Sequence, residues 1–75
     1  MKDWEKAIDD CGFKRNYKSK YDYEYNDGTW TWCLNYEGYA YVLYMMYRGK
    51  EVPIAHFRDP KKFTTLMEIL TDKLD

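Results

Sequence analysis

One segment near the middle of the chain limits the possible folds more than any other. Residues 39–48 read Tyr-Ala-Tyr-Val-Leu-Tyr-Met-Met-Tyr-Arg, so both alternating sets of side chains are largely apolar or aromatic. Many of these residues are aromatic or β-branched, and Gly38 and Gly49 flank the segment, which favours a strand over a buried helix. A strand that is apolar on both faces is typical of a sheet interior. We therefore expect the remaining elements to pack around Tyr39–Arg48.

Helices are predicted before and after the strands in the chain. Asp3 is suited to cap a short N-terminal helix that Gly12 ends, with one apolar face made of Trp4, Ala7, Ile8 and Cys11. Asp59 is suited to cap a longer helix in which Pro60 is the first residue. Its apolar face consists of Phe63, Leu66, Met67, Leu70 and Leu74.

The segments between the helices alternate with the period of strands. Tyr17–Asn26 and Thr29–Tyr36 place aromatic and apolar residues on one face only, and Asp27-Gly28 between them is a strong hairpin signal. A fourth strand is predicted over Glu51–Arg58, and Pro53 places it at a sheet edge.

The three turns also predict a register. With loops of two residues at Asp27-Gly28, Glu37-Gly38 and Gly49-Lys50, Tyr23 faces Trp32 and Trp32 faces Leu43, with His56 beside Leu43. Each turn signal is independent of the other two, yet together they align the apolar residues of four strands on one face. This agreement favours an antiparallel meander.

The sequence thus predicts one small α+β domain over residues 1–75. Its expected architecture is a four-stranded antiparallel meander flanked by a short N-terminal helix and a longer C-terminal helix, in the order α-β-β-β-β-α. A chain of 75 residues buries little core, but aromatic residues make up 20% of it and each buries roughly 150–250 Å².

The sheet face opposite the C-terminal helix is the predicted partner-binding site. It would carry an apolar set made of Val42, Tyr44, Met46, Pro53 and Phe57. Either the N-terminal helix covers these residues, or they bind a protein target or a second copy of the chain. The sequence leaves both interpretations open.

Two basic clusters raise a different possibility. Arg58, Lys61 and Lys62 stand at the start of the C-terminal helix, where an anion could bind. The other cluster consists of Lys14, Arg15, Lys18 and Lys20. Together they suggest nucleic-acid binding as the alternative function, although alternation would point the tyrosines away from Lys18 and Lys20 and the net charge is −1.

Catalysis and cofactors are not expected. His56 is the only histidine, and its predicted place is a partly buried one without a nucleophile or a second metal ligand beside it. Cys11 and Cys33 lack metal-site spacing and are expected to be free thiols. Since no apolar run resembles a signal peptide or a membrane span, we expect a soluble cytoplasmic protein that does not bind membranes.

By exclusion, the sequence favours a small non-catalytic protein-binding module that acts by occupying a partner's surface. Stand-alone inhibitors and accessory proteins encoded by phages or other mobile elements are one population of such chains. No residue pattern specifies a small-molecule substrate, so the expected partner is a protein target or a second copy of the chain.

Overall fold

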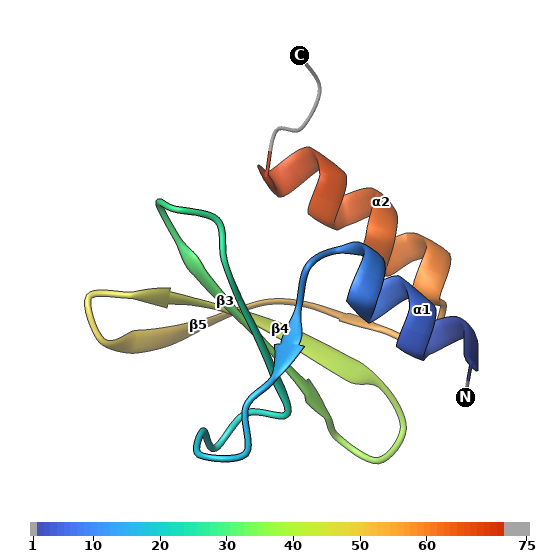
Figure 1. The fold of residues 1–75 in the computed structure, drawn as a ribbon, viewed down its shortest axis with the longest axis horizontal. Coiled ribbons are helices and arrows are strands. Elements are labelled where there is room, and N and C mark those ends of the chain that lie inside the picture. The colour runs from blue at the N-terminus through green and yellow to red at the C-terminus, as the bar shows by residue number, and fades with distance from the viewer. Residues whose placement is uncertain (1, 72–75) are drawn as a thin grey trace.

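The structure, a computed structural model, describes residues 2–71. A five-stranded antiparallel sheet carries both helices on one face, and its strands follow one another in chain order (Figure 1). The elements are α1 (Lys2–Asp10), β1 (Lys14–Arg15), β2 (Tyr23–Asn26), β3 (Thr31–Tyr36), β4 (Tyr41–Tyr47), β5 (Lys50–Phe57) and α2 (Pro60–Thr71). The α+β class and the meander are confirmed, with one strand more than predicted.

The start of α2 is the predicted one. The backbone N–H of Lys61 donates to the Asp59 carboxylate at 2.9 Å, and Pro60 is the first helical residue. Phe63 and Met67 are buried on the inner face of this helix. Leu74, predicted to belong to the same apolar face, lies outside the described residues.

The end of α1 depends on Gly12. The N–H of Phe13 donates to the Ile8 carbonyl at 3.1 Å and the N–H of Gly12 to the Asp9 carbonyl at 3.0 Å, which is a Schellman motif. Gly12 has a φ of 87°, and a Cβ there would lie 3.0 Å from the Tyr25 ring. Any other residue would therefore be strained at this position. The predicted stop is confirmed, while the helix begins at Lys2 instead of after Asp3.

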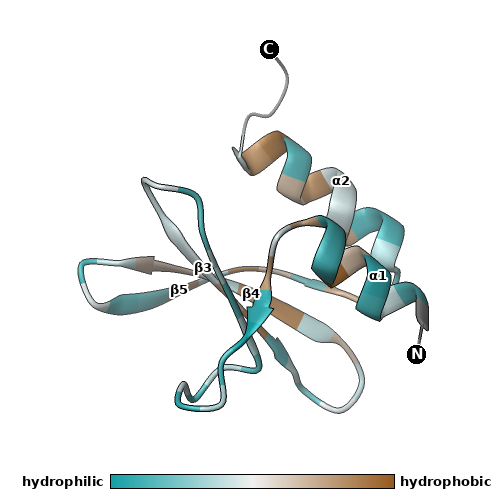
Figure 2. Cartoon of the chain, in the orientation of Figure 1, coloured by the Kyte–Doolittle hydropathy of each residue, from teal (hydrophilic) through white to brown (hydrophobic). Residues whose placement is uncertain are grey.

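Phe63 lies at the centre of an aromatic core between the helices and the sheet. Its ring centroid is 5.5 Å from those of Trp4 and Phe13 and 5.6 Å from that of Phe57. Both helices are amphipathic, with hydrophobic and hydrophilic residues alternating along them (Figure 2). Trp32 of β3 is 3% exposed, so its predicted place in the core is confirmed.

Two of the hairpin loops are longer than predicted. Asn26 pairs with Thr31 and Tyr36 with Tyr41, so each loop contains four residues. Leu34 consequently faces Tyr23 and Leu43. The pairing is shifted by two residues from the predicted register, and a shift of two leaves every side chain on its predicted face.

A β-bulge in β5 overturns part of the predicted face. Tyr44 pairs with Pro53, but Leu43 pairs with Ala55, so one extra residue is inserted in β5. An insertion of one residue exchanges the two faces beyond it. Phe57 therefore points into the core, where it is 8% exposed, and His56 is exposed on the opposite face. The predictions that Phe57 belongs to the binding site and that His56 packs beside Leu43 are wrong.

Residues 16–22 form turns instead of the first half of the predicted strand. Their polar side chains bind nearby backbone: Asn16 Oδ1 accepts from the N–H of Lys18 at 3.0 Å, and Ser19 Oγ accepts from the N–H of Tyr21 at 3.1 Å. Such bonds compete with strand pairing. Asp22 then ties the loop to β3, accepting from the N–H of Tyr36 at 2.8 Å. The loop carries Tyr21 to the face opposite the one predicted.

Candidate functional site

The sheet face without helices holds four of the five predicted partner-binding residues. We call it the helix-free face and define it by Val42, Tyr44, Met46 and Pro53. The first three are partly exposed and Pro53 is exposed. The alternation of β4, together with the pairing of Tyr44 with Pro53, places all four on the same side of the sheet.

The N-terminal helix does not cover this face. Trp4 of α1 lies in the core on the other side of the sheet, with its ring centroid 4.3 Å from that of Tyr41 and its indole N–H donating to the Arg58 carbonyl at 3.3 Å. Ile8 belongs to the same core cluster as Phe63. Of the two interpretations that the sequence left open, covering by α1 is therefore wrong.

A tyrosine from the loop covers one part of the helix-free face. The ring centroid of Tyr21 is 5.8 Å from that of Tyr44, and the Tyr21 hydroxyl donates to the Glu51 carboxylate. Lys20 lies 3.6 Å from the same carboxylate. Burial, helped by the bond to Glu51, raises the pKa of the Tyr21 hydroxyl, so the phenol stays neutral and continues to donate. Tyr21 therefore covers the helix-free face at Tyr44 and is held there by its bond to Glu51.

Cys33 lies buried in the same part of the sheet. It pairs with Tyr44 across the strands and is 1% exposed. Burial raises the pKa of its thiol to about 11, which leaves almost no thiolate near neutral pH. Both Cys33 and Cys11 are buried thiols. Cys33 is thus a packing residue, and the chemistry of a reactive cysteine is not expected from it.

The basic residues at the start of α2 do not form an anion-binding site. Arg58, Lys61 and Lys62 are all exposed, and the first backbone N–H groups of the helix already bond to Asp59. The guanidinium of Arg58 instead lies over the Tyr39 ring, 5.8 Å from its centroid. The geometry gives Arg58 an aromatic neighbour that the sequence did not indicate.

The other basic cluster is divided by the fold. Arg15 of β1 donates to the Tyr23 hydroxyl at 2.8 Å, and its guanidinium lies 4.7 Å from the Tyr23 ring centroid and 5.6 Å from that of Tyr17. Lys20 is used in the ion pair with Glu51. The expectation that rings and positive charges do not share a surface is wrong for Arg15, and it is wrong for Lys20 as well, whose ammonium lies 5.2 Å from the Tyr21 ring centroid.

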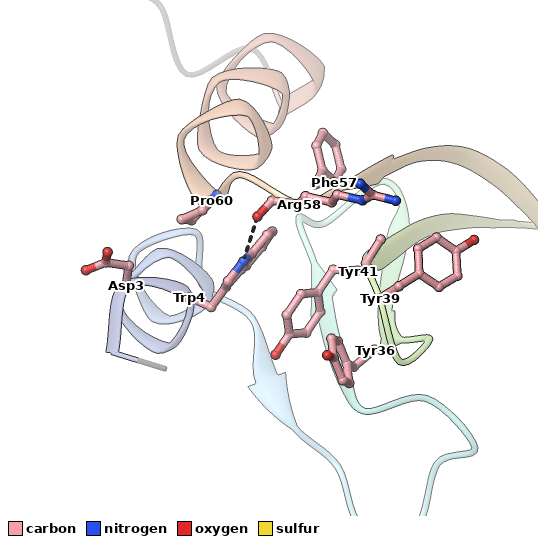
Figure 3. Close-up of a pocket in the computed structure, with 9 residues that line it drawn as sticks. Asp3, Trp4, Tyr36, Tyr39, Tyr41, Phe57, Arg58 and Pro60 are labelled. Carbon is pink, nitrogen blue, oxygen red and sulfur yellow. Dashed lines mark hydrogen bonds between the residues drawn. The ribbon is translucent and has the colours of Figure 1, made fainter.

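An aromatic pocket opens where α1, the β3–β4 hairpin and the start of α2 meet (Figure 3). Its volume is about 440 Å³. We define the aromatic pocket by four rings and one cation, namely Trp4, Tyr36, Tyr39, Tyr41 and Arg58. Ring centroids of Tyr36 and Tyr41 are 5.0 Å apart. Burial raises the pKa of the Tyr41 hydroxyl, which therefore stays neutral.

Sequence reasoning missed this pocket for a structural reason. Its walls come from segments far apart in the chain, and their meeting depends on where α1 docks. The available signal was Tyr39, a large aromatic residue directly after the turn glycine Gly38, which is 64% exposed in the structure.

Comparisons with known proteins add no functional assignment. No protein-family model, no curated protein and no solved structure matches the chain. Within residues 2–71, no cluster of three or more histidine, cysteine, aspartate or glutamate residues is arranged to hold a metal ion. Neither described helix is long and apolar enough to cross a membrane.

Proposed function

We propose that this protein is a non-catalytic protein-binding module and that the helix-free face is its binding surface. One observation carries the proposal. Both helices pack on the same side of the sheet, which leaves Val42, Met46 and Pro53 without a covering layer from the described chain. An apolar sheet face left open in this way is typical of a surface that a partner covers.

The chemistry of the face fits a protein partner. Tyrosine and methionine are favoured in protein interfaces because they supply large contact areas, and here Tyr44 and Met46 are two residues apart on the same face of β4. Polar residues flank the two ends of the face: Val42 lies between Asn35 and His56, and Met46 lies between Thr31 and Glu51. An apolar centre with a polar rim is the usual arrangement of an interface. A module of this kind would act as an inhibitor or accessory protein by occupying its partner's surface.

A charge placed on the face tests the proposal. Val42→Arg should weaken partner binding by at least about 100-fold, since burying an unpaired charge in an interface costs several kcal/mol. Val42 is partly exposed, so the longer side chain can reach solvent in the free protein and the fold should persist. Ile69→Arg is the matched control, because Ile69 is 63% exposed on α2.

The measurement has two arms. Sedimentation equilibrium of the native chain tests for a second copy as partner, and quantitative affinity capture from a lysate of its native host tests for a protein target. A dimer or a captured protein that is lost with Val42→Arg and kept with Ile69→Arg supports the proposal. If both variants bind as the native chain does, the interface lies elsewhere.

Nucleic-acid binding is the second candidate, and Arg15 is the observation in its favour. A guanidinium placed over the Tyr23 ring resembles the combination of cation and aromatic surface that holds single strands. Titration with single-stranded and duplex oligonucleotides at low salt tests this function. Binding tighter than about 10 µM that weakens steeply with salt, and that Arg15→Gln removes, would favour it over the protein-binding proposal.

A further inference from the structure

We infer that the aromatic pocket binds a short peptide segment of a partner in which one apolar side chain stands next to a carboxylate. This goes beyond the proposed function, because the pocket uses none of the residues of the helix-free face. A volume of about 440 Å³ is small for a ligand pocket, whose usual range is roughly 300–1,000 Å³. It has room for one or two side chains.

The walls of the pocket provide an apolar surface at its centre. Trp4 comes from α1 and Tyr36 and Tyr41 come from the β3–β4 hairpin, and the ring of Tyr41 lies between the other two, 4.3 Å from Trp4 and 5.0 Å from Tyr36. The indole N–H of Trp4 is already bonded to the Arg58 carbonyl. The centre of the pocket therefore offers ring faces and few free polar groups, which suits an apolar side chain.

Arg58 gives the pocket a preference for negative charge on one side. Its guanidinium extends toward Tyr39, whose ring holds it at 5.8 Å, and the side chain is exposed (Figure 3). A planar guanidinium accepts a carboxylate through two parallel hydrogen bonds.

The opposite side of the pocket carries negative charge, and this limits the ligand. Asp3 lines the pocket across from Arg58 (Figure 3). A nucleic-acid strand carries a charge at every phosphate and would meet the Asp3 carboxylate as it crossed the pocket. A peptide with a single carboxylate beside its apolar residue avoids Asp3. The charge distribution therefore favours an acidic peptide over a nucleic acid.

Amide NMR with short probes tests the inference. The probes are the acetylated and amidated tetrapeptides Gly-Glu-Leu-Gly and Gly-Lys-Leu-Gly, with the single strand dT4 as the competing ligand class. Gly-Glu-Leu-Gly should shift the Trp4 indole N–H and the amides of Tyr39 and Tyr41 with a dissociation constant in the low millimolar range. Gly-Lys-Leu-Gly should bind at least about tenfold more weakly, since the charge-assisted bond is missing.

Arg58→Gln is the decisive variant. It removes the guanidinium but keeps the backbone carbonyl that Trp4 bonds to, so the pocket should retain its shape. Binding of Gly-Glu-Leu-Gly should fall by about tenfold and the preference over Gly-Lys-Leu-Gly should disappear. Arg48→Gln is the matched control, because Arg48 lies 5.4 Å from the centroid of the Tyr47 ring, near the β4–β5 turn.

Three results would overturn the inference. The first is the absence of shifts at the pocket with up to 10 mM of either peptide. The second is equal binding of the two peptides. The third is tighter binding of dT4 than of Gly-Glu-Leu-Gly with steep weakening by salt, which would assign the pocket to nucleic acid.

Discussion

Truncating Tyr21 should make Cys33 reactive without unfolding the protein. The Tyr21 ring lies against Tyr44 on the helix-free face, in the part of the sheet where Cys33 is 1% exposed. Tyr21→Ala removes this ring and also the hydroxyl that donates to Glu51. Solvent would then reach the Cys33 thiol, while the core around Phe63 on the other side of the sheet would remain packed.

The size of the effect follows from the ionisation of the thiol. Burial raises the pKa of Cys33 to about 11 from the ordinary value of 9.0. A return to the ordinary value would increase the thiolate fraction at pH 8 by about 100-fold, and the thiolate is the species that reacts. Improved access adds to this. Alkylation of Cys33 should therefore become at least about 100-fold faster in Tyr21→Ala.

Iodoacetamide labelling followed by peptide mass spectrometry measures this at each cysteine separately. Cys11, which is buried in the core on the opposite side of the sheet, reports global unfolding and should stay protected. Tyr21→Phe should leave Cys33 protected because the ring remains. Tyr17→Ala, in the same loop at a residue that is 88% exposed, should also have no effect. Unchanged labelling of Cys33 in a folded Tyr21→Ala variant would refute the proposed covering by Tyr21.

Three further predictions concern the fold. Trp32→Ala should lower the free energy of unfolding by about 3–5 kcal/mol in urea titrations, as expected for truncation of a buried aromatic residue. Asp27 accepts bonds from the N–H groups of Thr29 and Trp30 at 2.8 and 2.7 Å, and the bond from Trp30 is the main cause of its lowered pKa. The stabilisation by the Asp27 carboxylate should therefore be complete above about pH 4 and be lost as the pH falls through the lowered pKa. Asp27→Ala should lower the free energy of unfolding by about 1–2 kcal/mol at pH 7. Between pH 5 and pH 2 the variant should lose less stability than the native chain in urea titrations. Phe57→Asp should unfold the domain in circular dichroism whereas the neighbouring His56→Asp should not, and the opposite result would contradict the bulge in β5.

The elements that the sequence predicted correctly depend on local rules. Asp59 and Gly12 use side-chain capping and a positive φ, which need no information from distant residues. The core face of β3 and β4 was also predictable, since an error of two residues in loop length leaves alternation unchanged. Trp32 and Leu43 are therefore buried as expected, although they do not face one another.

The errors have two physical sources. The bulge in β5 adds one residue at a position that periodicity does not reveal, although Pro53 beside it is a residue that sheets tolerate at bulges. The strand predicted over Tyr17–Asn26 was shortened because Asn16 and Ser19 bond to nearby backbone more favourably than a neighbouring strand would. The alternating tyrosines of this segment have the period of a strand, which outweighed the turn signals of Asn16 and Ser19 in the prediction.

The candidate sites needed information on how the helices dock. The helix-free face is open because α1 packs beside α2 on the other side of the sheet. The apolar residues of α1 alone could not show which face of the sheet the helix packs on. The aromatic pocket has the same origin, because Trp4 and Tyr39 come together only when α1 packs next to the β3–β4 hairpin.

Site-specific photo-crosslinking tests the central claim most directly. A benzophenone amino acid at Val42 places the reactive group on the helix-free face, and the same group at Ile69 places it on the exposed side of α2. On irradiation in its native host, the Val42 probe should form one discrete crosslink, to a protein target or to a second copy of the chain, and the Ile69 probe should not. A crosslink of equal yield from both positions, or from Ile69 alone, would contradict the assignment of the helix-free face as the binding surface.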